Sequence, residues 1–136
     1  NGGLHTNYSG KAQAAVKALT EDGYDFVYVH IEAPDEMGHQ GSVKDKIKAI
    51  EYIDDQVIGP VAEKLRQSGV DFRMLILPDH PTPVRVRTHT SDPVPYLLYD
   101  STEVQEGCST YCEKTGRESG KMLEEGYRLI DHLLQN

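Results

Sequence analysis

Apolar patterns of two kinds alternate along this chain, and the alternation restricts it to few folds. Three stretches carry apolar side chains at the spacing of one helix face, and three shorter runs resemble buried strands. Helices that alternate with buried strands favour an α/β layer structure with a largely parallel sheet. We predict, in order, helix 10–22, strand 25–31, helix 43–68, strand 72–77, strand 94–99 and helix 122–134.

Local signals set the expected boundaries of these elements. Ser42, with Asp45 three residues later, forms a capping-box pattern at the start of the long helix. Gly59 and Pro60 fall inside that helix, so we expect a kink or a break there. A proline cannot donate a ladder hydrogen bond, so Pro95 should make the third strand begin late or lie at an edge. The residues from 101 to 116 are expected to be irregular.

Length and charge limit the expected partners. The 136 residues suit one ordinary domain, taken here as residues 1–136, and 22 acidic against 14 basic side chains give a net charge of −8. Nucleic acid and anionic membranes need clustered positive charge, so neither is an expected partner. With no long apolar span and no signal-peptide pattern, the sequence predicts a soluble, cytoplasmic protein. Cys108 and Cys112 are expected to be reduced thiols.

Acidic and histidine side chains gather in the loops that follow the first two predicted strands. Open α/β sheets bind ligands at the carboxyl ends of their strands, so these loops are the expected site. In the first loop, Asp35 and His39 are four residues apart, which puts both on one side of a helical turn. A carboxylate and an imidazole placed in this way could reach one cation.

The second loop offers Asp79, His80 and His89. Pro78 and Pro81 bracket the first two and force a bend, which lets their side chains converge. Oxygen and imidazole ligands without thiolate suit Zn²⁺ or Mn²⁺, and ligands on two adjacent strand ends suggest a two-metal site. Taken singly, each of these side chains could instead cap a helix, satisfy a loop hydrogen bond or be solvated.

Further side chains near the two loops are weaker candidates. Arg85 and Arg87 are two residues apart, so in an extended segment they would share a face and could clamp phosphate or carboxylate, or else be solvated. Glu32 and Asp92 could orient the metal ligands from outside the ligand set. His30 and His132 are expected to be packing or surface residues.

Three runs of sequence carry a family resemblance. They are Asp25-Phe-Val-Tyr-Val-His-Ile-Glu-Ala-Pro-Asp-Glu-Met-Gly-His39, Leu77-Pro-Asp-His-Pro-Thr-Pro83 and Thr88-His-Thr-Ser-Asp-Pro-Val-Pro-Tyr96. Together they resemble the archaeal-type, cofactor-independent phosphoglycerate mutases of the alkaline phosphatase superfamily. The resemblance extends over nearly the whole chain, and its Asp-His-Pro-Thr-Pro run is specific to this branch.

The resemblance implies a partial alkaline-phosphatase-like sheet and two divalent ions, Mn²⁺ or Zn²⁺, with Mg²⁺ possible. Asp35, His39 and His89 would hold one ion, and Asp79 and His80 the other. The family's nucleophilic serine and a further aspartate ligand belong to a segment upstream of everything matched here. We therefore expect a C-terminal part that does not interconvert 3- and 2-phosphoglycerate by itself, whereas the longer enzyme would do so through a phosphoserine.

The resemblance also suggests substrate contacts and leaves other functions open. Lys11 and His5 lie in a segment like the family's return from its inserted substrate domain, so Lys11 could contact phosphoglycerate. Another phosphoryl-transfer enzyme of the superfamily, such as a phosphatase, a phosphopentomutase or a nucleotide phosphodiesterase, is disfavoured by the Asp-His-Pro-Thr-Pro loop. A kinase-like role lacks a glycine-rich nucleotide loop. A non-catalytic metal-binding module is the alternative from a different class.

Overall fold

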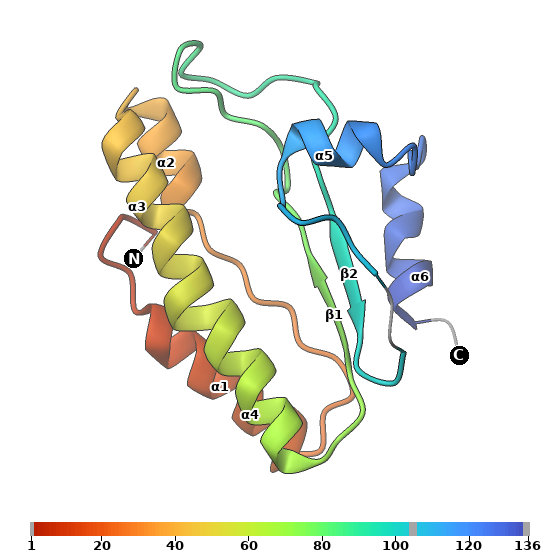
Figure 1. The fold of residues 1–136 in the computed structure, drawn as a ribbon. Coiled ribbons are helices and arrows are strands. Elements are labelled where there is room, and N and C mark those ends of the chain that lie inside the picture. Colours follow the sequence, from red (N-terminus) through yellow and green to blue (C-terminus); the bar gives the residue numbers. More distant parts are fainter. Residues whose placement is uncertain (1, 104–105, 135–136) are drawn as a thin grey trace. The chain divides into compact units, whose positions relative to one another are not determined.

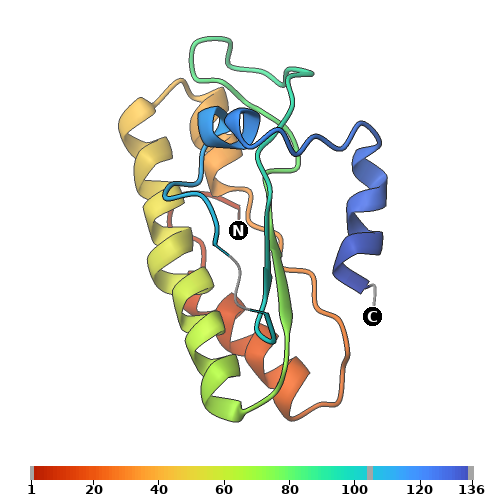
Figure 2. The ribbon, with the colours of Figure 1, turned by 45° about the vertical axis from the view of Figure 1, so that its right-hand side comes forward.

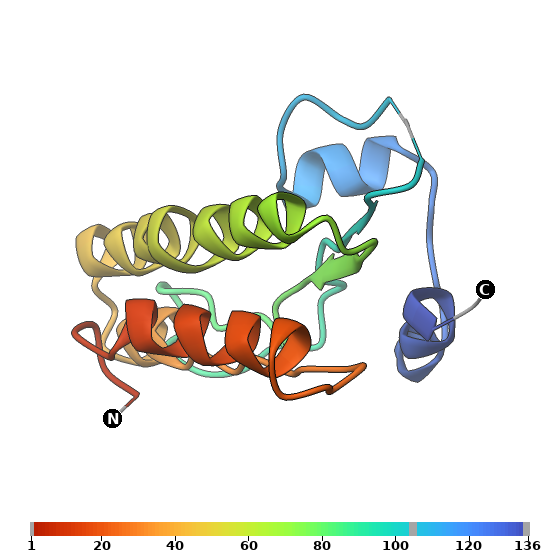
Figure 3. The same cartoon turned by 90° about the horizontal axis from the view of Figure 1, so that it is seen from below.

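The structure is a computed structural model that describes residues 2–103 and 106–134. Figures 1, 2 and 3 show its ribbon in three views. The chain forms two compact units, the first made of residues 2–70 and 81–90 and the second of residues 71–80 with the described residues after 90. Helices and strands are both present, in agreement with an α/β class. Among the described residues, no helix has the length and apolarity that crossing a bilayer requires.

The first unit begins with helix α1 (Tyr8–Thr20), which fits the predicted helix closely. Its cap is Asn7, because the Asn7 side chain accepts a hydrogen bond from the Gly10 amide at 2.9 Å. Helix α2 (Ala33–His39) follows in a region expected to be a loop with at most a helical turn. Pro34 lies in its first turn, where the fixed φ of a proline suits a helix start.

A long helical rod follows, made of α3 (Val43–Ile53), the π-helical turn η1 (Asp54–Ile58) and α4 (Gly59–Ser68). Ser42 caps α3 by accepting from the Asp45 amide, and its hydroxyl donates to the Asp45 carboxylate at 2.8 Å. The π turn lies directly before Pro60, where the sequence predicts an interruption, because the proline cannot donate to the preceding turn. Figure 2 shows that the rod continues through this point.

The core of the first unit lies where α1 and α2 pack on this rod. Tyr8 is buried and meets Tyr52 edge-on, with ring centroids 5.7 Å apart. Figure 3 shows α1 beside the rod. The apolar side chains in this core are Tyr8, Ala12, Ala15, Ala33, Met37, Ala49, Val57, Val61 and Leu65. Val43, Ile47 and Ile50 follow the apolar spacing of the predicted helix 43–68, but each is more than half exposed.

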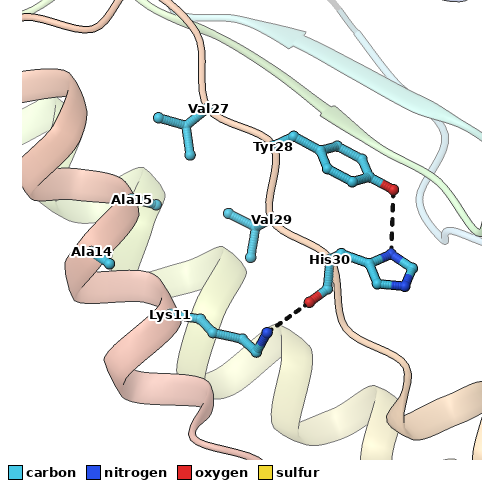
Figure 4. A pocket seen from close by; sticks show the side chains of 7 residues that line it. All are labelled: Lys11, Ala14, Ala15, Val27, Tyr28, Val29 and His30. Atoms are coloured by element: carbon cyan, nitrogen blue, oxygen red, sulfur yellow. Dashed lines mark hydrogen bonds between the residues drawn. The ribbon is translucent and has the colours of Figure 1, made fainter. Parts of the chain in front are cut away.

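Residues 25–31 run extended but form no strand, so the prediction of a strand buried on both faces is wrong for this structure. The alternate side chains Val27 and Val29 are half-buried, whereas Phe26 and Tyr28 are exposed. Figure 4 shows both valines on the side of α1, with Tyr28 turned away. A strand is defined by ladder hydrogen bonds to a neighbour, and the described part of this unit supplies no neighbouring strand.

The second unit holds the two strands of the described structure, β1 (Arg73–Ile76) and β2 (Leu97–Asp100). They pair antiparallel, with Arg73 opposite Asp100 and Ile76 opposite Leu97. The described residues thus contain no parallel pair, and the expected mostly parallel sheet is not what they form. The third strand does begin late, two residues after Pro95, as the missing proline N–H predicts.

The remaining helices are short. Helix α5 (Glu113–Glu118) begins inside the stretch 101–116, so the expectation of irregular structure is wrong from residue 113 on. Residues 104 and 105 of that stretch lie outside the described residues. The predicted last helix is reduced to a 3₁₀ turn, η2 (Gly126–Arg128), and α6 (Leu129–Leu134), of which Leu129 is buried. Both cysteines are free, as expected.

The Tyr111 hydroxyl donates to the Pro95 carbonyl at 2.9 Å, and burial raises the pKa of Tyr111 to about 12.

The β1–β2 pair predicts a specific loss of stability in acid. Hydrogen bonds from Thr102 and then from Arg73 lower the pKa of Asp100 from 3.8 to about 2. A lowered folded-state pKa contributes stability above about pH 4 that is lost as the pH falls towards 2. We expect Asp100→Asn to lower the Tm at neutral pH and to flatten its fall between pH 4 and pH 2. Circular dichroism melts at each pH test this, and parallel Tm profiles for both proteins would contradict it.

Candidate metal centre

Helix α2 places Asp35 and His39 on the same side, one turn apart. The Oδ2 atom of Asp35 lies 3.4 Å from the Nε2 atom of His39. The carboxylate belongs to the first turn of the helix and the imidazole to the last, the ends that the helix dipole favours for a negative and a positive group. A four-residue spacing in a loop would fix neither side chain, so the helix is what brings the two groups together.

The loop of residues 81–90 adds His89 to this pair. The Nε2 atom of His89 lies 3.4 Å from Oδ1 of Asp35 and 3.2 Å from Nε2 of His39. The two imidazole rings are tilted by 50° with centroids 5.1 Å apart. One carboxylate and two imidazoles thus converge within the first unit. We call Asp35, His39 and His89 the histidine–aspartate cluster.

The histidine–aspartate cluster is open to solvent on one side. The side chains of Asp35, His39 and His89 keep 32%, 38% and 52% of their surface exposed, respectively. None is sealed in the core, so an ion or a small molecule could reach all three from solution. Partial exposure also lowers the cost of keeping the carboxylate charged.

The His39 ring is oriented by the loop backbone. Its Nδ1 atom lies 3.0 Å from the carbonyl oxygen of Arg87. A carbonyl can only accept, so in the neutral ring Nδ1 carries the proton and Nε2 keeps a lone pair that faces Asp35 and His89. Arg87 has a φ of 59°, in the left-handed region that non-glycine residues seldom adopt. This strained backbone presents the carbonyl to the histidine.

Thr82 orients the carboxylate of Asp35. Its hydroxyl donates to Oδ1 of Asp35, and its own carbonyl accepts a hydrogen bond from the Nζ atom of Lys46 at 2.6 Å. Thr82 is only 3% exposed, one of two polar residues buried among those described. Asp35 therefore has a fixed direction before any ion is bound.

The donors of the histidine–aspartate cluster fit a divalent cation of intermediate hardness. Imidazole nitrogen and carboxylate oxygen suit Zn²⁺ or Mn²⁺, and the His39 tautomer leaves the nitrogen that a metal requires. Ligand atoms about 2.1 Å from a tetrahedral ion lie roughly 3.4 Å from one another, similar to the 3.2–3.4 Å separations here. The two histidines face different oxygens of Asp35, with Oδ2 towards His39 and Oδ1 towards His89.

Asp79 and His80 follow β1 and end the first of the two segments that make up the second unit. Asp79 is exposed and His80 is half-buried. Their expected role as ligands of a second ion stays a prediction.

Arg85 and Arg87 are arranged differently from the expectation. The amides of Val86 and Arg87 both donate to the Pro83 carbonyl at 2.9 Å, so the segment is a turn and not an extended stretch that presents both arginines on one face. The guanidinium of Arg87 lies over Gly41, where a Cβ would fall 2.4 Å from its Nε atom. The contribution of Arg87 to the histidine–aspartate cluster is its carbonyl.

Lys11 lies away from the histidine–aspartate cluster, beside a hollow on the extended segment. Its ammonium donates to the His30 carbonyl at 2.9 Å, as Figure 4 shows. A hollow of about 320 Å³ is lined by Gly2, Thr6, Lys11, His30 and Glu32. Glu32 does approach a histidine, but that residue is the exposed His30, at 3.8 Å, and not a member of the cluster.

Sequence reasoning missed Thr82 and Lys46. Thr82 stands between two prolines, which restrict the backbone around it, and this is the one local signal of a fixed position. Lys46 lies on a helix among other lysines and carries no comparable signal. The contact between them joins residues 36 positions apart, which periodicity cannot reveal.

Gly38 is expected to be required for the close approach of the loop to α2. A Cβ at this position would lie 2.5 Å from the Thr82 carbonyl oxygen and 3.0 Å from Nζ of Lys46. We expect Gly38→Ala to lower the free energy of unfolding by about 1–2 kcal/mol, because the clash outweighs the gain in helix propensity. Urea denaturation measures this.

Gly3→Ala is the matched control, since a Cβ at Gly3 meets nothing within 4 Å. This variant should be as stable as the parent chain. Equal stability of Gly38→Ala and the parent would show that the loop does not press on α2 as described.

Comparisons with known proteins were made for the whole chain. A family model described as the Metalloenzyme superfamily matches residues 3–126. The chain is 44% identical over 134 residues to a protein of Geobacter sulfurreducens named a probable 2,3-bisphosphoglycerate-independent phosphoglycerate mutase. It is 45% identical over 133 residues to a protein of Methanothrix thermoacetophila named a 2,3-bisphosphoglycerate-independent phosphoglycerate mutase. Each match covers 98% of this chain and 33% of the relative.

A solved structure is also similar. The PH0037 protein from Pyrococcus horikoshii matches with a TM-score of 0.82 at 27% identity, over 98% of this chain and 39% of that one. The chain therefore spans about a third of the length of the curated relatives that it matches.

Proposed function

Because the chain belongs to the metalloenzyme superfamily, we propose that it is the metal-binding part of a cofactor-independent phosphoglycerate mutase. The single observation that carries this proposal is the convergence of Asp35, His39 and His89 within one unit. The phosphoglycerate mutase names of the relatives support the choice of reaction.

In this proposal Asp35, His39 and His89 hold one divalent ion. Asp79 and His80 hold a second, and both ions are Mn²⁺ or Zn²⁺, with Mg²⁺ as an alternative. Bound cations withdraw electron density from phosphate oxygens and stabilise the charge that develops in phosphoryl transfer. The contribution of the chain is to direct the ligands correctly, which the Arg87 carbonyl does for His39 and the Thr82 hydroxyl does for Asp35.

Substrate contacts and location are part of the same proposal. The substrate of the longer enzyme is phosphoglycerate, and its interconversion between the 3- and 2-isomers proceeds through a phosphoserine. The serine and the inserted substrate domain belong to the longer protein, so the 136-residue chain alone should show no mutase activity. Lys11, with its ammonium beside the polar hollow, is the proposed contact for an anionic group, and the arginines 85 and 87 are weaker candidates. We place the enzyme in the cytoplasm, without nucleic-acid or membrane partners.

The test uses the protein expressed from its full-length gene, supplied with Mn²⁺, and follows conversion of 3- to 2-phosphoglycerate. We expect turnover that His39→Ala and His89→Ala abolish. Metal affinity should fall in both variants by more than the roughly 10- to 100-fold that loss of an outer partner costs. His132→Ala, which changes an exposed histidine of α6, is the control and should match the parent.

The assay separates the alternatives. Release of inorganic phosphate without isomer conversion would indicate a phosphatase of the same superfamily and contradict the mutase proposal. Metal binding without any turnover on phosphoglycerate would favour a non-catalytic module. Full activity of both histidine variants would show that the histidine–aspartate cluster is not the metal centre.

A further inference from the structure

We propose that Thr82 is a positioning residue that fixes the Asp35 carboxylate in its metal-binding orientation. The inference rests on the proposed metal site and adds to it a residue outside the proposed ligand set, which acts through Asp35. Its basis is a chain of contacts from α3 through the 81–90 loop to α2.

The first contact joins the hydroxyl of Thr82 to Oδ1 of Asp35. A carboxylate on a short side chain can rotate about its last bond, and rotation would exchange the two oxygens between the histidines. The hydrogen bond from Thr82 holds Oδ1 in place, so Oδ2 stays directed at His39, 3.4 Å from its Nε2 atom. Because Thr82 is 3% exposed, water cannot readily take the place of its hydroxyl.

The second contact holds Thr82 itself. Lys46, from α3, donates from Nζ to the Thr82 carbonyl at 2.6 Å. The carbonyl also lies so close to α2 that only a glycine fits at position 38. A charged donor makes the stronger kind of hydrogen bond, so this contact resists movement of the loop.

The loop is also rigid for local reasons. Pro81 and Pro83 flank the threonine and restrict its backbone. The Thr90 amide donates to the Pro81 carbonyl at 3.1 Å, which closes the loop beside His89. The branched side chain of Thr82 has few rotamers, so its hydroxyl keeps one direction. The same loop therefore sets the position of His89 and the direction of Asp35.

The experiment compares Co²⁺ binding to the 136-residue chain and to its variants by visible absorption. Thr82→Val should weaken Co²⁺ binding about 10- to 100-fold, the range for loss of an outer partner, and should change the d–d band as Asp35 turns. Thr82→Ser restores the hydroxyl and should restore both affinity and spectrum. Thr88→Val makes the same change at an exposed position of the same loop and should leave both unchanged.

A change of folding is separated from a change of positioning. Circular dichroism melts identify any variant that does not fold. If Thr82→Val does not fold, Thr82→Ala replaces it, because alanine removes the hydroxyl without adding a methyl group against Asp35. Equal Co²⁺ affinity and spectrum in the parent and the hydroxyl-free variant would overturn the inference and leave the metal site standing. Absence of Co²⁺ binding in the parent chain would overturn the proposed metal site and the inference with it.

Discussion

The hydrogen bond from Thr82 to Asp35 joins two segments that could not hold their shapes separately. Helix α2 has seven residues, fewer than an isolated helix needs to be stable in water, and the 81–90 loop has no ladder of its own. Each is fixed by the other and by Lys46 on the rod. The positions of His39 and His89 depend on this junction, because one belongs to the helix and the other to the loop. The chemistry of the histidine–aspartate cluster is thus a property of the packing between α2, the loop and α3.

Backbone strain and solvent exposure are both concentrated around the histidine–aspartate cluster. Arg87 has a left-handed backbone, Gly38 leaves no room for a side chain, and the members of the histidine–aspartate cluster keep part of their surface in solvent. Elsewhere in the first unit the contacts are those of ordinary helix packing, such as Tyr8 against Tyr52. Unfavourable local geometry that the surroundings maintain is expected where a protein arranges groups for binding.

Much of the local structure could be predicted from the sequence. The cap at Ser42 and the late start after Pro95 follow from the chemistry of single residues, and the structure has both. Before Pro60 the helix changes to a π-helical turn but does not break. The spacing of Asp35 and His39 likewise places them on one side of a turn. The direction of Asp35 could not be predicted, because it depends on Thr82 and Lys46, whose contacts join residues 47 and 36 positions apart. Residues 25–31 have a strand-like composition, yet a strand also needs a partner, which composition does not provide.

X-ray absorption spectroscopy of the chain loaded with a single equivalent of Zn²⁺ tests the central claim most directly, since it reports the ligand atoms themselves. If Asp35, His39 and His89 hold the ion, the inner shell contains only nitrogen and oxygen at about 2.0–2.2 Å, with the outer scattering of two imidazoles. The imidazole signal should fall by half in His89→Ala. Sulfur scatterers at about 2.3 Å would place the ion on the cysteines instead, and an inner shell without imidazole would contradict the assignment.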